Sequence, residues 1–494
     1  MSCHKYAAAF MPKEAIGYLA CLLVPAILWL YLRKIVGSKF PRVGKNPWIH
    51  GLANARNDFL KNGRALTEEG YQKYRGSMYV VQTADTERLI LSNSFLDELR
   101  ALPEAQLSSR AAQCDRHLGY HTTLDVVNQS SLHSDVCRAP LTKHSAPLAL
   151  ALYEETQFAL TKVSLAKCVP DSEDYEYFSA YPMMMNTLNR VMSRALVGYP
   201  MCRNKTWLST AMSYTINAFT ISGTLRDQYH FLRPIIYRFL PARREIYRQL
   251  ATANQLLVPL LKERATTGGK IDNLQWLTDS AFIGLAAINA SNMGVVNAIF
   301  DLCAMPEYIE TLRKEIEKCT TEAGGWNLSA INNMERLDSF LKESQRINHP
   351  GIFSFNRKVL KPLTLSNGSV IPKGTFIAMP TYFIARDAEY YPSPEVFQPW
   401  RFYEKSKANG KANSQYQFCS TSRENLAFGY GKSACPGRFF AALQMKIILA
   451  DLVMRYDFKF PDGQTKRPES DFADERISPS KTQLVGFRLR KLAK

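Results

Sequence analysis

A single cysteine near the C-terminus lies in a sequence context that suits metal chemistry. Cys435 follows Gly429 and Gly431 and precedes Gly437, and an apolar, proline-free run begins at Phe439. Glycines allow positive φ and a close approach of the backbone to a bulky group. A sulfur at the start of a helix gains from the positive end of the helix dipole, which favours thiolate over thiol. A cysteine with only a packing role would not need three glycines, so the pattern predicts a loop that presents a thiolate to a large, flat partner.

The spacing of this loop resembles the haem-binding loop of the cytochrome P-450 family, whose cysteine is the proximal ligand of the haem iron. The matching residues are Phe428, Gly431, Cys435 and Gly437, in the pattern Phe-x-x-Gly-x-x-x-Cys-x-Gly. The resemblance implies that Cys435 is the metal ligand of a haem b and that Phe428 packs near the sulfur side of the haem. It also implies that Gly429, Gly431 and Gly437 shape the loop around the cofactor.

Basic residues that reach the haem propionates in the family are matched only in part. The family usually has Arg or His two residues before the cysteine, but this chain has Ser433, so we expect Lys432 or another cation to replace that contact. Arg138 matches an early helical arginine of the family, although the aromatic residue expected four places earlier is Ser134. Arg357 matches a second propionate contact. The resemblance therefore adds Lys432, Arg138 and Arg357 to the predicted cofactor-binding residues.

Three charged residues are predicted to form a structural network near the haem. Glu343 and Arg346 are three residues apart in a helical run that ends at Pro350, so they share one helix face. An exposed pair of this kind would contribute less than about 1 kcal/mol. The family, however, has a Glu-x-x-Arg element here, joined by an arginine that Arg401 matches. The resemblance implies that Glu343, Arg346 and Arg401 form a buried structural network.

The helix predicted over residues 276–305 departs from the family where oxygen is handled. The family has a small pair followed by an acid and an alcohol, which deliver protons during oxygen activation. Ala286 and Ala287 match the small pair, but Asn289 and Ala290 replace the acid and the alcohol. Ser291, or a water molecule held by Asn289, is the expected substitute, so Asn289, Ala290 and Ser291 are the candidate catalytic residues. Alternatively, Asn289 only makes hydrogen bonds inside a buried helix.

The remaining pattern predicts the elements that position these residues. Helical periodicity dominates from about residue 140 onward, and short strands are predicted at 78–82, 89–91, 363–370 and 375–380, the last two as a hairpin-like pair. The fold class is therefore mainly α with minor β-sheets. The resemblance covers nearly the whole chain and implies the two-lobed cytochrome P-450 fold. Three stretches, residues 95–99, 198–204 and 431–441, are similar to fungal microsomal enzymes of the ent-kaurene oxidase kind.

Charge and cysteine content narrow the partners and the compartment. The chain has 494 residues, a formal net charge of +18 and ten cysteines. The basic residues are scattered and no zinc-finger spacing occurs, which favours membrane and protein partners over nucleic acid. No Cys-x-x-Cys pair is present, so neither a disulfide framework nor a zinc site is expected, and the cysteines suit a reducing compartment.

The N-terminus is predicted to anchor the protein in a membrane. Residues 15–32 carry no charge, and as a helix they would span roughly 27 Å, enough for a thin bilayer such as the endoplasmic reticulum. A cleaved signal peptide is the alternative, but no small-residue cleavage site follows. More basic residues follow the segment than precede it, which leaves the rest of the chain in the cytosol. We therefore expect an anchor at 1–36, a Pro-rich basic linker at 37–50 and a catalytic domain at 51–494.

Taken together, these features predict a membrane-anchored haem-thiolate monooxygenase that acts on a lipophilic, terpenoid-like secondary metabolite. Electrons would come from NADPH through a flavoprotein reductase that docks on a basic face around the Cys435 loop, with cytochrome b5 as a second candidate partner. The resemblance implies a substrate pocket lined by residues 122–131, 219–225, 282–291 and 350–355.

Two alternatives follow from the substitutions at Asn289 and Ala290. The first keeps the haem fold but isomerises, dehydrates or cyclises its substrate without activating oxygen. The second is a haem-dependent sensor without enzymatic activity, which gains less support from the sequence. The product formed with and without NADPH and reductase would separate these hypotheses.

Overall fold

The computed structural model describes residues 25, 40–129, 134–135, 137, 145–170, 172–266, 273–408 and 414–491. The predicted anchor at 1–36 lies outside this part apart from residue 25. Arg138 and the side chains of Ala286 and Ala287 lie outside it as well. Within the described ranges, no helix is both long enough and apolar enough to cross a bilayer. The anchor therefore stays a prediction.

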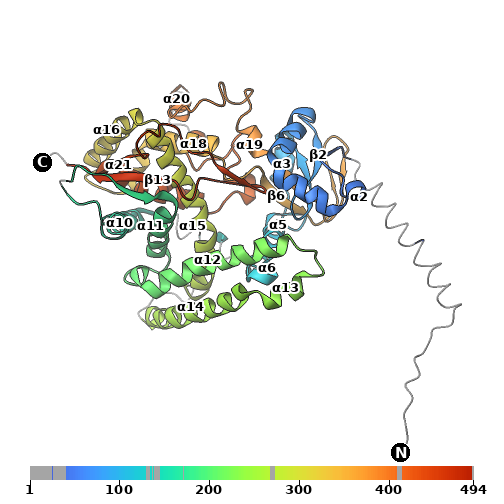
Figure 1. The fold of residues 1–494 in the computed structure, drawn as a ribbon, viewed down its shortest axis with the longest axis horizontal. Coiled ribbons are helices and arrows are strands. Elements are labelled where there is room, and N and C mark those ends of the chain that lie inside the picture. The colour runs from blue at the N-terminus through green and yellow to red at the C-terminus, as the bar shows by residue number, and fades with distance from the viewer. Residues whose placement is uncertain are drawn as a thin grey trace, which may run out of the picture.

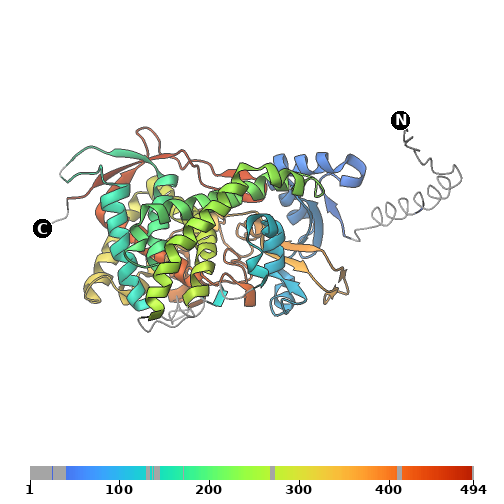
Figure 2. The ribbon, with the colours of Figure 1, turned by 90° about the horizontal axis from the view of Figure 1, so that it is seen from below.

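Long helices form most of the molecule, as the periodicity predicts (Figure 1). The bounds of the principal helices are α10 (Ser145–Ala159), α11 (Ala180–Leu196), α12 (Lys205–Arg226), α14 (Pro241–Thr266), α15 (Asn273–Ala304), α16 (Glu307–Glu322), α18 (Glu335–Ile347) and α21 (Arg438–Arg455). In Figure 2, α12 and α14 lie side by side across one face of this helical part. Apolar residues from α10, α11, α15, α16, α18 and α21 share one hydrophobic core.

A six-stranded sheet forms the other part of the molecule, together with α3 (Leu52–Lys73) and α5 (Ser109–Arg116) (Figure 1). Its strand order is β1-β2-β3-β9-β6-β4. The bounds are β1 (Arg42–Val43), β2 (Met78–Gln82), β3 (Glu87–Leu91), β4 (Leu107–Ser108), β6 (Ser354–Val359) and β9 (Phe376–Met379). The strands predicted at 78–82 and 89–91 are confirmed as β2 and β3, and this sheet has hydrophobic clusters of its own.

One strand prediction is wrong. Residues 363–370 are not a single strand that pairs with 375–380, because a turn interrupts them. Asn367 accepts a hydrogen bond from the backbone N–H of Ser369 through its side-chain oxygen, and Gly368 has a positive φ of 79°. The chain instead forms a small hairpin of β7 (Leu363–Thr364) and β8 (Val370–Ile371). Strand β9 then joins the main sheet between β3 and β6.

Three shorter strand groups complete the fold and position the C-terminal segment. Strands β10 (Tyr456–Lys459), β13 (Leu484–Leu489) and β5 (Glu176–Ser179) form a three-stranded sheet beside α11. Strands β11 (Asp471–Ala473) and β12 (Arg476–Ser478) form a hairpin whose turn reaches the main sheet. The molecule is therefore mainly helical with small sheets, as the sequence predicts.

Candidate functional site

The Cys435 loop is a tight turn directly before α21. The backbone N–H of Cys435 donates to the carbonyl of Phe428 at 2.7 Å, and this bond closes the loop. Gly429 and Gly431 have φ values of +73° and +70°, which side-chain-bearing residues rarely adopt. A Cβ on Gly431 would lie 2.6 Å from the Cβ of Arg100. Both glycines are therefore required by the path of the backbone.

The thiol of Cys435 combines exposure with desolvation. The residue is accessible to solvent, yet burial among surrounding protein atoms raises the pKa of its thiol. Hydrogen bonds from the backbone N–H groups of Gly437 and Arg438 and the charge of Arg438 oppose this rise but do not overcome it. The groups at the helix start therefore act in the direction expected from the sequence, but desolvation outweighs them in the free thiol. A metal bound to this accessible sulfur would deprotonate it.

Helix α15 has one exposed small residue in its middle. Ala290 is exposed in mid-helix, whereas Ile288, Ser291 and Asn292 are buried. Gly294 lies one turn later on the same face, and a Cβ there would lie 2.4 Å from the Cε of Met445 on α21. Helix α15 therefore packs against α21, the helix that directly follows the Cys435 loop.

Asn289 makes a hydrogen bond to a neighbouring helix. Its Oδ1 accepts a hydrogen bond from the hydroxyl of Tyr181 on α11 at 2.9 Å. The side chain of Asn292 donates to the carbonyl of Tyr181 at 3.3 Å. Successive residues on a helix point about 100° apart, so Asn289, Ala290 and Ser291 cannot face one point together. Of the three, only Ala290 is exposed, and the geometry agrees with the alternative that Asn289 makes internal hydrogen bonds.

Arg357 is a buried cation on β6 without an acidic partner. It is 6% exposed, and its guanidinium lies 4.1 Å from the ring centre of Phe355. A bulge at Ser354–Arg357 and a φ of +54° at Phe355 set its direction. Burial lowers the pKa of Arg357 to about 10, against the opposing charge of Glu104. Among the described residues it forms no ion pair, and a buried charge of this kind calls for an anionic ligand.

Two other residues near the predicted propionate site, Ser433 and Lys432, form hydrogen bonds with neighbouring protein groups. Ser433 donates its hydroxyl to Glu104 at 3.1 Å. Lys432 is exposed, and its ammonium donates to the carbonyl of Ala101 at 3.4 Å. The structure thus turns Lys432 toward the neighbouring loop. Arg138 lies outside the described residues, but the adjacent Cys137 comes within 3.7 Å of where a Cβ on Gly437 would lie.

The predicted triad is brought together as a compact group, which we call the core cluster (Glu343, Arg346, Arg401). Glu343 Oε1 is 2.7 Å from Arg346 Nη2, and Arg401 Nε lies 3.2 Å from both oxygens of Glu343. The three residues are 0%, 4% and 4% exposed. The guanidinium groups also donate to the backbone carbonyls of Pro392 and Pro394. Each buried charge therefore has ionic and hydrogen-bonding partners.

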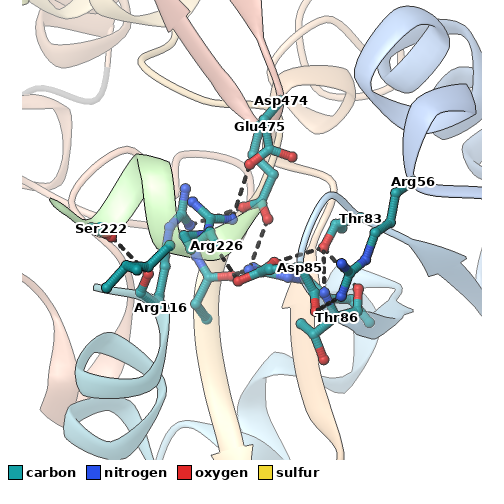
Figure 3. Close-up of polar contacts among 12 residues, drawn as sticks. Arg56, Thr83, Asp85, Thr86, Arg116, Ser222, Arg226, Asp474 and Glu475 are labelled. Carbon is teal, nitrogen blue, oxygen red and sulfur yellow. Dashed lines mark hydrogen bonds and ion pairs between the residues drawn. The ribbon is translucent and has the colours of Figure 1, made fainter. Parts of the chain in front are cut away.

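Sequence reasoning missed a second charged group, which we call the rim cluster. Its members are Arg56, Asp85, Arg88, Arg116, Arg226, Asp474 and Glu475, most of which are drawn in Figure 3. Arg226, at the end of α12, pairs with Asp85 at 2.9 Å and with Asp474 at 3.0 Å. Glu475 pairs with Arg88 at 2.8 Å and with Arg116 at 2.9 Å. These residues come from remote segments, so no local spacing in the sequence could have indicated the cluster.

Comparison with known proteins identifies the family. A model of the cytochrome P-450 family matches residues 226–485, a range that contains the core cluster and the Cys435 loop. The chain belongs to the cytochrome P-450 family. Cytochromes P-450 carry a haem that is held by a cysteine thiolate, and they generally need a redox partner.

Fungal relatives align over almost the whole P-450 chain. It is 34% identical to a cytochrome P-450 monooxygenase of Emericella nidulans over 502 residues, which covers 96% of this chain and 93% of the relative. It is 35% identical to a cytochrome P-450 monooxygenase of Penicillium canescens over 475 residues, 91% of this chain and 87% of the relative. It is 32% identical to an ent-kaurene oxidase of Gibberella intermedia over 506 residues, 98% and 95% of the two chains. The protein is therefore a P-450-type oxidoreductase.

The described residues fit the haem that this family carries. The Cys435 sulfur is accessible to solvent at the end of a glycine-built loop, where it could bind the iron. The buried guanidinium of Arg357 is of the type that binds a carboxylate such as a haem propionate. Ala290, whose side chain is only a methyl group, is exposed on α15, which packs against the helix that follows this loop.

Proposed function

We propose that this P-450 is a membrane-anchored monooxygenase that oxidises a lipophilic, terpenoid-like secondary metabolite, using O2 and electrons from NADPH. The observation that carries the proposal is the tight, glycine-built turn that leaves the Cys435 thiol accessible to solvent just before α21. The relative named ent-kaurene oxidase supports the terpenoid class, since it aligns over 98% of this chain. Relatives named as monooxygenases favour oxidation over isomerisation, cyclisation or sensing.

Cys435 is the proposed ligand of the haem iron, and Arg357 and Arg138 are the proposed contacts of the propionates. Phe428 would pack beside the sulfur, because it is half-buried and lies edge-on to Phe418 with 5.5 Å between the ring centres. When bound, the haem supplies the oxygen-activating chemistry of the family. The core cluster would hold α18 and the segment before Arg401 in place, as a structural support without a chemical role.

Proton delivery on the α15 side would depend on water. Ala290 has no side-chain proton to donate, and Ser291 is 3% exposed. The methyl group of Ala290 is smaller than the threonine side chain usual in the family, and the space left beside this exposed position would suit an ordered water molecule. Water in that place would donate protons during the reaction, which general acid catalysis requires.

The redox partner would be an NADPH-dependent flavoprotein reductase that docks beside the Cys435 loop, with cytochrome b5 as a second candidate. Lys432 is exposed there, and Arg438 lies at the start of α21. Basic side chains of this kind steer an acidic partner toward a surface. Residues 1–36 would anchor the chain in the endoplasmic reticulum membrane, with the catalytic domain in the cytosol and lipophilic substrate entering from the bilayer.

The CO-bound spectrum of the reduced protein tests the ligand assignment. Wild-type protein and a Cys168→Ala control should both give the Soret band that is typical of haem-thiolate proteins. Cys435→Ala should lose this band, because a neutral residue cannot replace the thiolate. A folded Cys435→Ala protein that keeps the band would exclude Cys435 as the ligand.

Turnover experiments test the reaction class. Candidate terpenoids should be oxidised only when NADPH and reductase are both present. Product formed at the full rate without electrons would refute the monooxygenase proposal and favour non-oxidative chemistry. A protein that binds haem but converts no terpenoid under either condition would also contradict it.

A further inference from the structure

One arginine beside the rim cluster has no acidic partner. Arg88, Arg116 and Arg226 each pair with a carboxylate within 3.0 Å. Arg476, the first residue of β12, is exposed, and it forms no ion pair or side-chain hydrogen bond with any residue that the structure describes. Its exposed guanidinium is therefore available to a group from outside the described part of the chain.

The backbone holds Arg476 against a segment predicted to line the substrate pocket. Gly351 pairs with Arg476 as an isolated bridge. The N–H of Ile352 donates to the carbonyl of Glu475 at 2.8 Å, and the N–H of Ile477 donates to Pro350 at 3.2 Å. Successive residues of a strand point to opposite sides. Because Glu475 and Ile477 are both buried, Arg476 points away from the sheet core that they join.

The positive charge of Arg476 lowers the pKa of groups on two other elements. His117, at the end of α5, is partly exposed, yet desolvation lowers its pKa to about 3, with further lowering by Arg116, Arg226 and Arg476. Burial raises the pKa of Tyr181, and Arg476 opposes this rise. Tyr181 is the residue that holds Asn289, the neighbour of Ala290. The charge of Arg476 therefore acts on the end of α5 and on the residue of α11 that contacts α15.

The region around Arg476 carries surplus positive charge. The rim cluster and Arg476 together bring five arginines against three carboxylates, as Figure 3 shows in part. His117, whose pKa the charge of Arg476 lowers, is neutral at physiological pH because its pKa is about 3. Its ring meets Phe219 of α12 edge-on, with 5.7 Å between the ring centres, and adds aromatic surface to the region. A cation in a region of positive excess attracts an anion.

We propose that Arg476 binds a carboxylate on the lipophilic substrate and so makes this P-450 selective for an acid. This inference rests on the proposed function, since it concerns the substrate of the same site. Arginine binds a carboxylate through two parallel hydrogen bonds, which fix orientation as well as affinity. With the acid group held at β12, the apolar body of the substrate lies along the segment from Pro350, which the backbone contacts hold beside Arg476.

Binding to the full-length holoprotein tests this proposal without turnover. Abietic acid and its methyl ester are the probes, because they differ only in the negative charge of one group. Equilibrium dialysis at neutral pH gives a Kd for each. Wild-type protein should bind the acid roughly 10- to 100-fold more tightly than the ester, the effect of one hydrogen-bonded charge. Arg476→Gln should abolish this preference and leave ester binding unchanged, and Arg476→Lys should retain part of it.

Arg248→Gln is the matched control. Arg248 lies on the outer face of α14 with its side chain 74% exposed, so its replacement makes the same charge change far from β12. It should leave both Kd values unaltered. The proposal is overturned if wild-type protein does not bind the acid, if it binds acid and ester equally, or if Arg476→Gln weakens both alike. Loss of the haem-thiolate spectrum in wild-type protein would instead contradict the proposed function.

Discussion

The core cluster and the rim cluster both bury arginine–carboxylate pairs, but they are assembled in different ways. The core cluster joins α18 to the segment just before α20 (Arg401–Ala408), and its carboxylate accepts hydrogen bonds from both arginines. The rim cluster joins α3, α5, α12, the β2–β3 turn and the β11–β12 turn. Several of its buried atoms, including both carboxylate oxygens of Glu475 and Oδ1 of Asp474, have no hydrogen bond of good geometry.

This difference suggests that the core cluster is rigid, whereas the rim cluster can rearrange. A buried charge with all its partners in one compact unit is costly to disturb. A cluster with incomplete hydrogen bonding has less to lose when its elements move apart. We therefore expect the core cluster to determine whether the protein folds and the rim cluster to determine how firmly the end of α12 is held.

Glu343→Ala should have the largest effect. It leaves Arg346 and Arg401 buried without a carboxylate, and breaking a buried pair in this way costs about 3–5 kcal/mol. Urea denaturation and the fraction of protein that incorporates haem would measure the loss. Glu335→Ala, also on α18, removes only an exposed pair with Lys407 and should cost less than about 1 kcal/mol. Equal losses in the two variants would contradict the role of the core cluster.

Arg226→Met should have a smaller and more local effect. It leaves Asp85 and Asp474 without their shared cation, for which we expect a loss of about 1–3 kcal/mol. Hydrogen exchange should quicken at the end of α12 and in the β11–β12 turn, while the core cluster stays protected. Arg248→Met provides the control on α14. Faster exchange throughout the molecule would show that the two clusters are not independent.

Acid pH should weaken the protein near both clusters through one histidine each. Burial lowers the pKa of His349, which follows α18, to about 4 and that of His117, beside the rim cluster, to about 3. Between the unfolded pKa near 6.5 and these values the unfolded state binds more protons, so stability falls as pH decreases from about 6.5.

The two histidines should differ in how strongly they contribute. For each histidine, the change of the free energy of unfolding with pH has an upper limit of about 1.4 kcal/mol per pH unit. His117 is partly exposed and His349 is only 3% exposed, so the contribution of His117 should fall further short of this limit. Urea denaturation of His349→Asn and His117→Asn at pH 7 and pH 5 would measure this. The pH dependence should decrease more for His349→Asn, and the reverse order would contradict the assigned environments.

Ala290→Thr should have the smallest effect. The added hydroxyl lies at an exposed position of α15 where the family has its alcohol, so the ratio of product to NADPH consumed should rise, by well below the roughly 100-fold that a positioned acid can contribute. Ser291→Ala is the control, because Ser291 is buried. If Ser291→Ala lowers this ratio and Ala290→Thr does not raise it, proton delivery depends on Ser291 rather than on water beside Ala290.

The same contrast explains what the sequence could predict. Glycine spacing around Cys435 and the three-residue spacing of Glu343 and Arg346 are local patterns, and the structure has the corresponding turn and ion pair. The side-chain direction of Asn289 depends on Tyr181, which lies 108 residues away. The rim cluster depends on pairs such as Arg226 and Asp474, 248 residues apart. Such contacts follow from the assembled fold, which no short spacing encodes.

Within residues 363–370, the turn-forming residues outweigh the hydrophobic residues that favour a strand. Apolar residues at both ends favour a continuous strand, but Asn367 and Gly368 between them are the residues that tight turns require. The structure has that turn, and β9 becomes a strand of the main sheet. Turn chemistry is therefore the more reliable guide where it competes with hydrophobic content.

The contact between Gly294 and Met445 has a mechanical consequence. A Cβ at Gly294 would lie 2.4 Å from the Cε of Met445, so a larger residue there would require the Met445 side chain to move. Helices α15 and α21 therefore approach closely where α15 has no side chain, and Ala290 lies four residues, or about 6 Å, away along α15. A residue larger than glycine at position 294 would thus change how α15 packs against the helix that begins beside Cys435.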